Sequence, residues 1–138
     1  MNNAILFSIK GKIQGGECEN TQDYRQLIAL KAQQAMIKAN LNRIDDEPLK
    51  VNIYAYFKMP EYFTKEQKEK ANQRILRPIN EPSALDIQKI YLDALNGVVW
   101  KDERQIIVLS CAKIYLLEHD LKELNEEEEN VDVFIEKM

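Results

Sequence analysis

The chain has 138 residues, of which 45% are apolar and 30% are charged, a composition typical of a soluble globular protein. No apolar run reaches the roughly 20 residues of a membrane-spanning helix, and the opening MNNA lacks the basic start of a secretory signal, so we expect a cytoplasmic protein with no membrane partner. The net charge of −4 is uneven, because residues 118–138 carry −7 and the rest +3. The body of the chain therefore remains open to nucleic-acid binding.

The first half of the chain predicts a strand, a helix and a second strand. Residues 4–9 (AILFSI) form an apolar run that fits a buried strand, and the glycine-containing residues 11–20 predict a loop. A helix with a broad apolar stripe is expected from Asn20 or Thr21 to about residue 41. Residues 51–57 then alternate apolar with Asn or Tyr, the period of a strand with one face in the core.

A basic, mostly polar helix follows. The sequence TKEQ at 64–67 is a capping box that opens a short helix to about residue 73 or 75. Residues 58–77 hold six basic and three acidic side chains. Mixed charges of this kind usually mark a solvated helix with ion pairs, and the alternative is an arm that contacts phosphates. The candidate DNA-binding residues are Lys65, Lys68, Lys70, Arg74 and Arg77.

The stretch from Glu81 to Arg104 predicts a capped amphipathic helix and a polar turn. Ser83 is the expected N-cap, and the pair Asn96-Gly97 ends the helix, because glycine accepts the left-handed conformation there. Between them, apolar residues recur at helical spacing and define a buried face: Ile87, Ile90, Tyr91, Ala94 and Leu95.

The last third predicts two more strands around an acidic segment. Residues 105–117 are long, β-branched and apolar, which favours a central strand. Residues 118–130 form an acidic connector, and residues 131–135 alternate as a final strand.

Carboxylates are the main candidates for chemistry. The chain lacks the glycine-rich motifs of phosphate-binding loops. Its one histidine, His119, lies beside acids, and Cys18 and Cys111 are isolated thiols without metal-ligand spacing. Asp86 with Lys89, and the pair Asp102-Glu103, would form a magnesium site if the segment folds back on itself. The alternative is that these acids serve as helix caps and solubility features.

One region resembles a known family. Residues 77–115 (RPINEPSALDIQKIYLDALNGVVWKDERQIIVLSCAKIY) are similar to the signature region of RusA-type Holliday-junction resolvases, which are small phage and prophage endonucleases. The match is dense from Lys89 onward and includes DALNGVVW at 93–100, then Asp102, Gln105 and Ile106, and finally Lys113 and Tyr115.

The resemblance implies a fold and an activity. It implies an α/β fold with a mixed sheet of about four strands packed with helices, in a single domain over residues 1–138, with an acidic connector near 118–130. It also implies a homodimer that cleaves branched DNA, such as a four-way junction, in recombination and repair, with Mg²⁺ (or Mn²⁺) as cofactor. By the same resemblance, Lys89, Asp86 and Glu103 are the catalytic candidates, and Asp86, Asp102 and Glu103 are the metal ligands.

The sequence departs from the family pattern at the three aspartate positions and in the early loop. Ser83 and Leu85 stand where the family has metal-binding aspartates, and Glu103 stands at the third aspartate position. The early loop, where the family usually has a basic segment, has little positive charge over residues 11–16. These departures favour an alternative, a catalytically inactive RusA-like protein that binds junction DNA or a protein partner. A structural homologue with no DNA role is the third interpretation.

Overall fold

A computed structural model describes residues 4–15, 21–117 and 128–138. Its elements, in chain order, are β1 (Ala4–Lys10), α1 (Thr21–Lys38), β2 (Leu49–Phe57), α2 (Lys65–Asn72), α3 (Ala84–Leu95), the 3-10 turn η1 (Glu103–Gln105), β3 (Ile106–Tyr115) and β4 (Asn130–Lys137). The four strands form one mixed sheet, which confirms the predicted α/β fold. Most of the predicted acidic connector, residues 118–127 with His119, and the thiol Cys18 lie outside the described residues.

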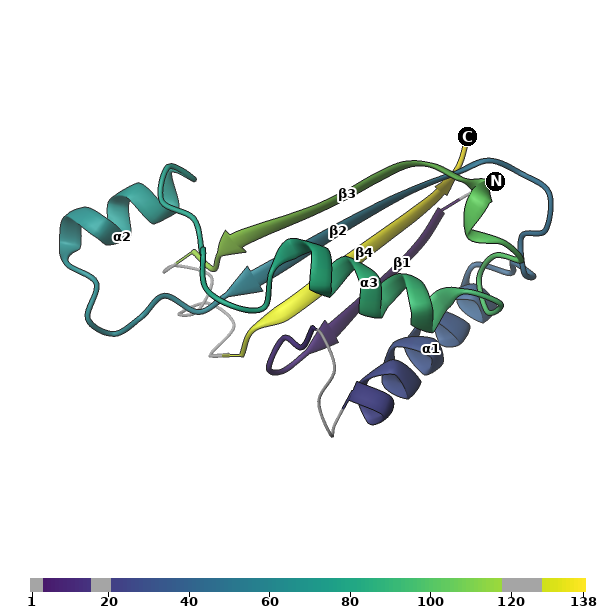
Figure 1. The fold of residues 1–138 in the computed structure, drawn as a ribbon, viewed down its shortest axis with the longest axis horizontal. Coiled ribbons are helices and arrows are strands. Elements are labelled where there is room, and N and C mark those ends of the chain that lie inside the picture. The colour runs from purple at the N-terminus through teal and green to yellow at the C-terminus, as the bar shows by residue number, and fades with distance from the viewer. Residues whose placement is uncertain (1–3, 16–20, 118–127) are drawn as a thin grey trace.

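The strand order in the sheet is β1-β4-β2-β3. The last strand in the chain, β4, lies between β1 and β2 and runs antiparallel to both, whereas β2 and β3 are parallel. Figure 1 shows α1 and α3 on one face of this sheet, and α2 beyond its end. The parallel pair requires a long crossover, and α2 and α3 lie within it.

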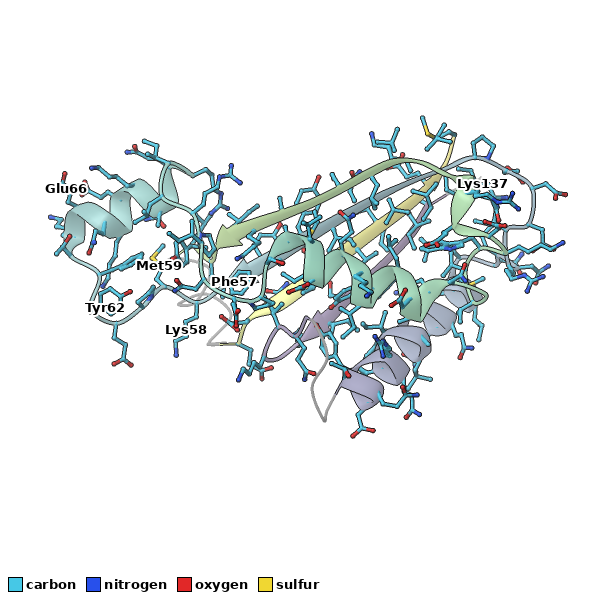
Figure 2. All side chains as sticks on the ribbon, in the orientation of Figure 1. Phe57, Lys58, Met59, Tyr62, Glu66 and Lys137 are labelled. Atoms are coloured by element: carbon cyan, nitrogen blue, oxygen red, sulfur yellow. The ribbon has the colours of Figure 1, made fainter. Side chains whose placement is uncertain are left out.

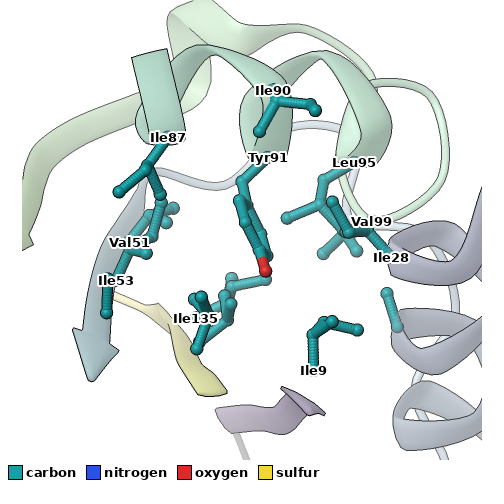
Figure 3. Packing of buried hydrophobic residues seen from close by; sticks show 14 of the residues in the cluster. Ile9, Ile28, Val51, Ile53, Ile87, Ile90, Tyr91, Leu95, Val99 and Ile135 are labelled. Atoms are coloured by element: carbon teal, nitrogen blue, oxygen red, sulfur yellow. The ribbon is translucent and has the colours of Figure 1, made fainter. Parts of the chain in front are cut away.

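The core lies between the sheet and the two helices. Buried and half-buried residues alternate along β2, with Val51 and Ile53 fully buried, as expected for a strand with one face in the core. Figure 3 shows Tyr91 extending from α3 into this core, among Ile9, Ile135 and other aliphatic side chains.

Two buried tyrosines join α1 to α3. The hydroxyl groups of Tyr24 and Tyr91 are 2.6 Å apart, and their rings pack edge to face. Burial raises the pKa of Tyr24, and it raises the pKa of Tyr91 well above the ordinary value of 10.0. Both hydroxyls therefore remain protonated at neutral pH and form a neutral hydrogen bond inside the protein.

Two of the predicted helix N-caps are confirmed. Thr64 and Gln67 form the capping box of α2, and Ser83 caps α3. Gly97, directly after the C-cap of α3, has a φ of +84°, as the Asn-Gly pair predicted. The first helix ends at Lys38 instead of about residue 41, because Asn40 adopts the left-handed conformation with a φ of +57°.

The prediction that the strand near 105–117 is central was wrong. The strand order places β3 at the edge of the sheet. Ile107 is 61% exposed, Val108 38% and Leu109 37%. A continuous apolar run is typical of a strand covered on both faces. Here the run lies on an edge strand whose first half is mostly exposed to solvent.

None of the described helices is long and apolar enough to cross a membrane.

Candidate functional site

The first two turns of α3 present three side chains to solvent. The Ser83 hydroxyl accepts a hydrogen bond of 3.0 Å from the backbone amide of Asp86. Because Ile87 and Ile90 are buried against the sheet, Leu85, Asp86 and Lys89 project to the outside, and all three are exposed. Leu85 is 76% exposed, so an apolar side chain stands in water where the family pattern has a carboxylate.

The early loop contacts this same turn. A Cβ atom added to Gly15 would lie 2.9 Å from Pro82 Cβ and 3.1 Å from the backbone carbonyl carbon of Asp86. The neighbouring backbone of Gln14 hydrogen-bonds the Tyr24 hydroxyl, which joins the loop to α1. Close approach of the backbone is the physical reason for glycine at position 15.

The segment before α3 is attached to β3. The Lys113 ammonium donates a hydrogen bond to the backbone carbonyl of Asn80 and lies 5.3 Å from the centre of the Phe57 ring. Partial burial lowers the pKa of Lys113. The sequence showed Lys113 only as a match to the family pattern, and neither it nor Gly15 was among the predicted site residues. Both position the front of α3.

The acids after α3 have a structural use. Asp102 caps η1, accepts a hydrogen bond from the Arg104 amide, and pairs with the Arg104 guanidinium at 2.7 Å. These contacts with Arg104 lower the pKa of Asp102 to about 2. The Gln105 side chain completes the capping box by accepting from the Asp102 amide at 2.8 Å. Glu103 is exposed at the start of η1.

One chain does not bring the two acidic groups together. A helix of 12 residues is about 17 Å long. Asp86 lies in the first turn of α3, whereas the pair Asp102-Glu103 follows its other end. Figure 1 shows α3 running opposite to β3, so its first turn lies near the C-terminal end of β3 and its last turn near the N-terminal end. Within the described residues, no three His, Cys, Asp or Glu side chains are grouped so as to hold a metal ion.

An open depression of about 500 Å³ lies beside Asp102, and Asp45 and Glu47 also line it. Asp46 and Asp102 complete its four acids, and three of the four are already paired. Asp45 forms an ion pair of 2.8 Å with Arg43, and Glu47 one of 3.4 Å with Lys137. This depression therefore gives no free carboxylate cluster.

The predicted basic residues lie on and after α2, which projects beyond the sheet. Figure 2 shows Tyr62 and Glu66 on this projection, at the opposite end of the molecule from Lys137. Three basic groups are engaged, since Lys70 pairs with Glu66 at 3.3 Å, Arg74 donates to the Tyr115 carbonyl at 2.7 Å and Arg77 donates to the Arg74 carbonyl at 3.2 Å. Three side chains remain at least partly exposed: Lys65, Lys68 and Arg77.

Comparison with known proteins gives two matches. The model of the family "Endodeoxyribonuclease RusA" matches residues 7–134. A protein of Bacillus subtilis (strain 168), "Uncharacterized protein YqaN", is 30% identical over 107 residues, which cover 76% of this chain and 72% of that protein. The family match includes the early loop, the front of α3, η1 and β3. This chain belongs to the RusA endodeoxyribonuclease family.

Proposed function

We propose that this protein is a Holliday-junction resolvase that binds four-way DNA junctions and nicks them in recombination and repair. The observation that supports this best is the family match over residues 7–134, which includes the complete front of α3. We assign the DNA contact to the end of the molecule where α2 projects. Lys65, Lys68 and Arg77 are at least partly exposed there, and lysine and arginine supply most of the affinity for phosphate backbones.

Lys89 is the residue we propose to act on the scissile phosphate. It is exposed on α3, six residues after Ser83. A fixed ammonium group beside a phosphodiester stabilises the negative charge that develops when the bond breaks. The amide groups at the start of α3 add the positive end of the helix dipole.

The residues of one chain do not fit the metal that the family resemblance implies. Mg²⁺ and Mn²⁺ prefer several carboxylate oxygens, but Ser83 is neutral and caps the helix, Leu85 has no donor atom, and Asp102 is bound to Arg104. Asp86 and Glu103 are left at separate ends of α3. We therefore derive no catalytic step through a metal ion within one chain.

Ser83 and Leu85, which stand where the family pattern has aspartates, favour a second candidate function. A RusA-family protein that has lost two aspartates could keep its scaffold and bind junctions without cutting them. The two candidates share the DNA surface and differ only in the chemistry at the front of α3.

Cleavage of a labelled four-way junction in Mg²⁺ or Mn²⁺ separates the candidates. The native protein is compared with the double variant Ser83→Asp/Leu85→Asp, and Ser83→Asn/Leu85→Asn is the neutral control. Aspartate and asparagine cap helices about as well as serine, and Leu85 is 76% exposed, so all three proteins should fold.

The outcomes have distinct meanings. If the native protein nicks the junction and Lys89→Ala does not, the result supports the resolvase. Nicking only by the aspartate variant identifies a silenced centre on an intact scaffold. No nicking by either protein, together with junction binding no tighter than binding to linear duplex, refutes both candidates.

The DNA surface is tested separately. Lys65→Glu/Lys68→Glu should weaken junction binding and reduce its dependence on salt. Lys31→Glu/Lys38→Glu on α1 is the matched control, because it reverses two charges at exposed positions away from α2. Equal losses in the two variants would refute the assignment.

A further inference from the structure

Tyr62 is an exposed aromatic side chain on the part of the molecule that projects beyond the sheet (Figure 2). It lies two residues before Thr64, the N-cap of α2, and it is 76% exposed. Every other aromatic side chain that the structure describes is buried or half-buried. Single exposed apolar side chains are common on protein surfaces, so the support of this ring and its surroundings decide whether it has a use.

The Tyr62 ring rests on a fixed support. It packs edge to face on Phe63, with ring centres 5.6 Å apart, and Phe63 packs in the same way on Tyr115 at 5.3 Å. Tyr115 is the last residue of β3 and is buried, so the row of three rings ends in the core. The Phe63 amide also donates to the Pro60 carbonyl at 3.2 Å. Tyr62 is therefore preorganised and loses little conformational entropy when a partner covers it.

The other end of the projection is attached to the same point. Arg74 lies two residues after α2 and donates a hydrogen bond of 2.7 Å to the Tyr115 carbonyl. Phe63 before the helix and Arg74 after it thus contact one residue at the end of β3. The projection seen in Figure 1 is therefore fixed to the sheet on both sides of α2, and Tyr62 keeps a defined position on it.

Positive charge lies next to the ring. Lys65 is the first residue of α2, Lys68 follows one turn later, and both are at least partly exposed. Residues 58–77 hold six basic and three acidic side chains, a net charge of +3. The contact with Phe63 has an interplanar angle of 81°, which leaves at least one face of the Tyr62 ring open. An open aromatic face beside cationic side chains suits single-stranded nucleic acid, because the ring stacks on a base and the charges contact phosphates.

We propose that Tyr62 stacks on a base that is exposed where the arms of branched DNA meet, while Lys65 and Lys68 contact the flanking phosphates. This inference rests on the proposed function and deepens it. In a linear duplex each base lies between two stacked neighbours, so the ring finds a free base face only at the ends. At a branch point the stack is interrupted and a base face becomes accessible. Tyr62 thereby favours branched over linear DNA without selecting a sequence, since every base has a π-face.

The affinity for three DNAs tests the stacking. A labelled four-way junction, a linear duplex and oligothymidine are titrated by fluorescence anisotropy in EDTA, so that no strand is cut. Tyr62→Ala should bind the junction and oligothymidine roughly 5- to 150-fold more weakly and the duplex within about twofold of native. Tyr62→Phe should bind like the native protein. Tyr62→Leu keeps an apolar side chain without a ring and should bind like Tyr62→Ala.

A matched control and the salt dependence separate the ring from other effects. Ile37→Ala on α1 removes a side chain that is 79% exposed and should bind all three DNAs like the native protein. Stacking releases no counterions, so Tyr62→Ala should keep the native slope of log affinity against log salt, whereas Lys65→Glu/Lys68→Glu should flatten it. An equal loss on all three DNAs in Tyr62→Ala, or the same loss in Ile37→Ala, would overturn the stacking.

Photo-cross-linking tests the contact in the native protein. Iododeoxyuridine is placed at the branch point of one junction and in the middle of an arm of another, and ultraviolet light joins this base to an aromatic side chain stacked on it. Trypsin cuts after Lys58 and Lys65, so the cross-link should lie in the peptide of residues 59–65, with fragmentation assigning it to Tyr62. It should arise only from the branch-point base. A cross-link elsewhere, or equal yields from the two positions, refutes the proposed contact.

Failure of the stacking differs from failure of the proposed function. Junction binding that weakens in Lys65→Glu/Lys68→Glu but not in Tyr62→Ala refutes the stacking and leaves the DNA surface standing. A protein that never nicks DNA but loses junction affinity in Tyr62→Ala supports the stacking and refutes the nuclease. A native protein that binds no branched DNA at low salt refutes both.

Discussion

Replacing Gly15 by alanine tests whether the early loop positions the front of α3. The added methyl carbon would lie 2.9 Å from Pro82 Cβ and 3.1 Å from both the carbonyl carbon and the Cβ of Asp86. Two of these atoms belong to stiff parts of the chain, a proline ring and a helix backbone, so they cannot rotate away. Either the loop or the first turn of α3 must move.

The expected cost follows from this contact. Adding one methyl group where no space exists usually destabilises a protein by about 1–3 kcal/mol. For a chain of this size, 1 kcal/mol lowers the melting temperature by roughly 4 °C, so Gly15→Ala should melt about 4–12 °C below the native protein. Urea unfolding followed by circular dichroism gives the free energy directly.

The second variant isolates the contact. Pro82→Gly removes one of the blocking atoms, so Gly15→Ala should cost less in the Pro82→Gly background, and the double-mutant cycle measures the coupling. The reasoning would be refuted if Gly15→Ala left the free energy of unfolding within about 0.3 kcal/mol of native. If stability falls as expected, junction nicking in the same variant shows whether the front of α3 must be held in place.

Three other predictions concern single side chains. Ser83→Ala should lower the free energy of unfolding by about 1 kcal/mol, and Ser83→Asp should change it much less, since aspartate also caps a helix; urea titration measures both. Because burial raises the pKa values of Tyr24 and Tyr91, the stability they supply is present below pH 10.0 and lost as the pH rises further. The urea midpoint of Tyr91→Phe should therefore fall less steeply in alkali than that of the native protein. Burial raises the pKa of Cys111 to about 11, so in a Cys18→Ser variant its alkylation by iodoacetamide should keep rising beyond pH 9.0, and a plateau at that pH would contradict this.

The local parts of the fold could be predicted from the sequence. The alternation of apolar residues in β2 predicted that Val51 and Ile53 lie in the core, as they do. A hydroxyl side chain before residues with a helical pattern predicted the caps Thr64 and Ser83, and both are observed. These signals depend on neighbours a few residues away, which the sequence contains in full.

Strand order was not predictable in the same way. The apolar run of β3 is equally consistent with a strand covered on both faces and with a strand at the edge of the sheet. The sequence favoured the first, and the structure places β3 at the edge. A hydrophobic pattern shows which residues could be buried, and it does not show where a strand lies in the sheet.

The same limit applies to the candidate site. Asp86 and Asp102 suit both a metal site and a helix cap, and sequence spacing does not separate these uses. The structure assigns Asp102 to a cap with Arg104 and shows that α3 is too long for its two ends to meet. Asp86 and Glu103 of one chain therefore do not form a common site. The caps depend on residues a few positions apart, which the sequence contains, whereas the separation of these acids depends on how α3 packs along the sheet.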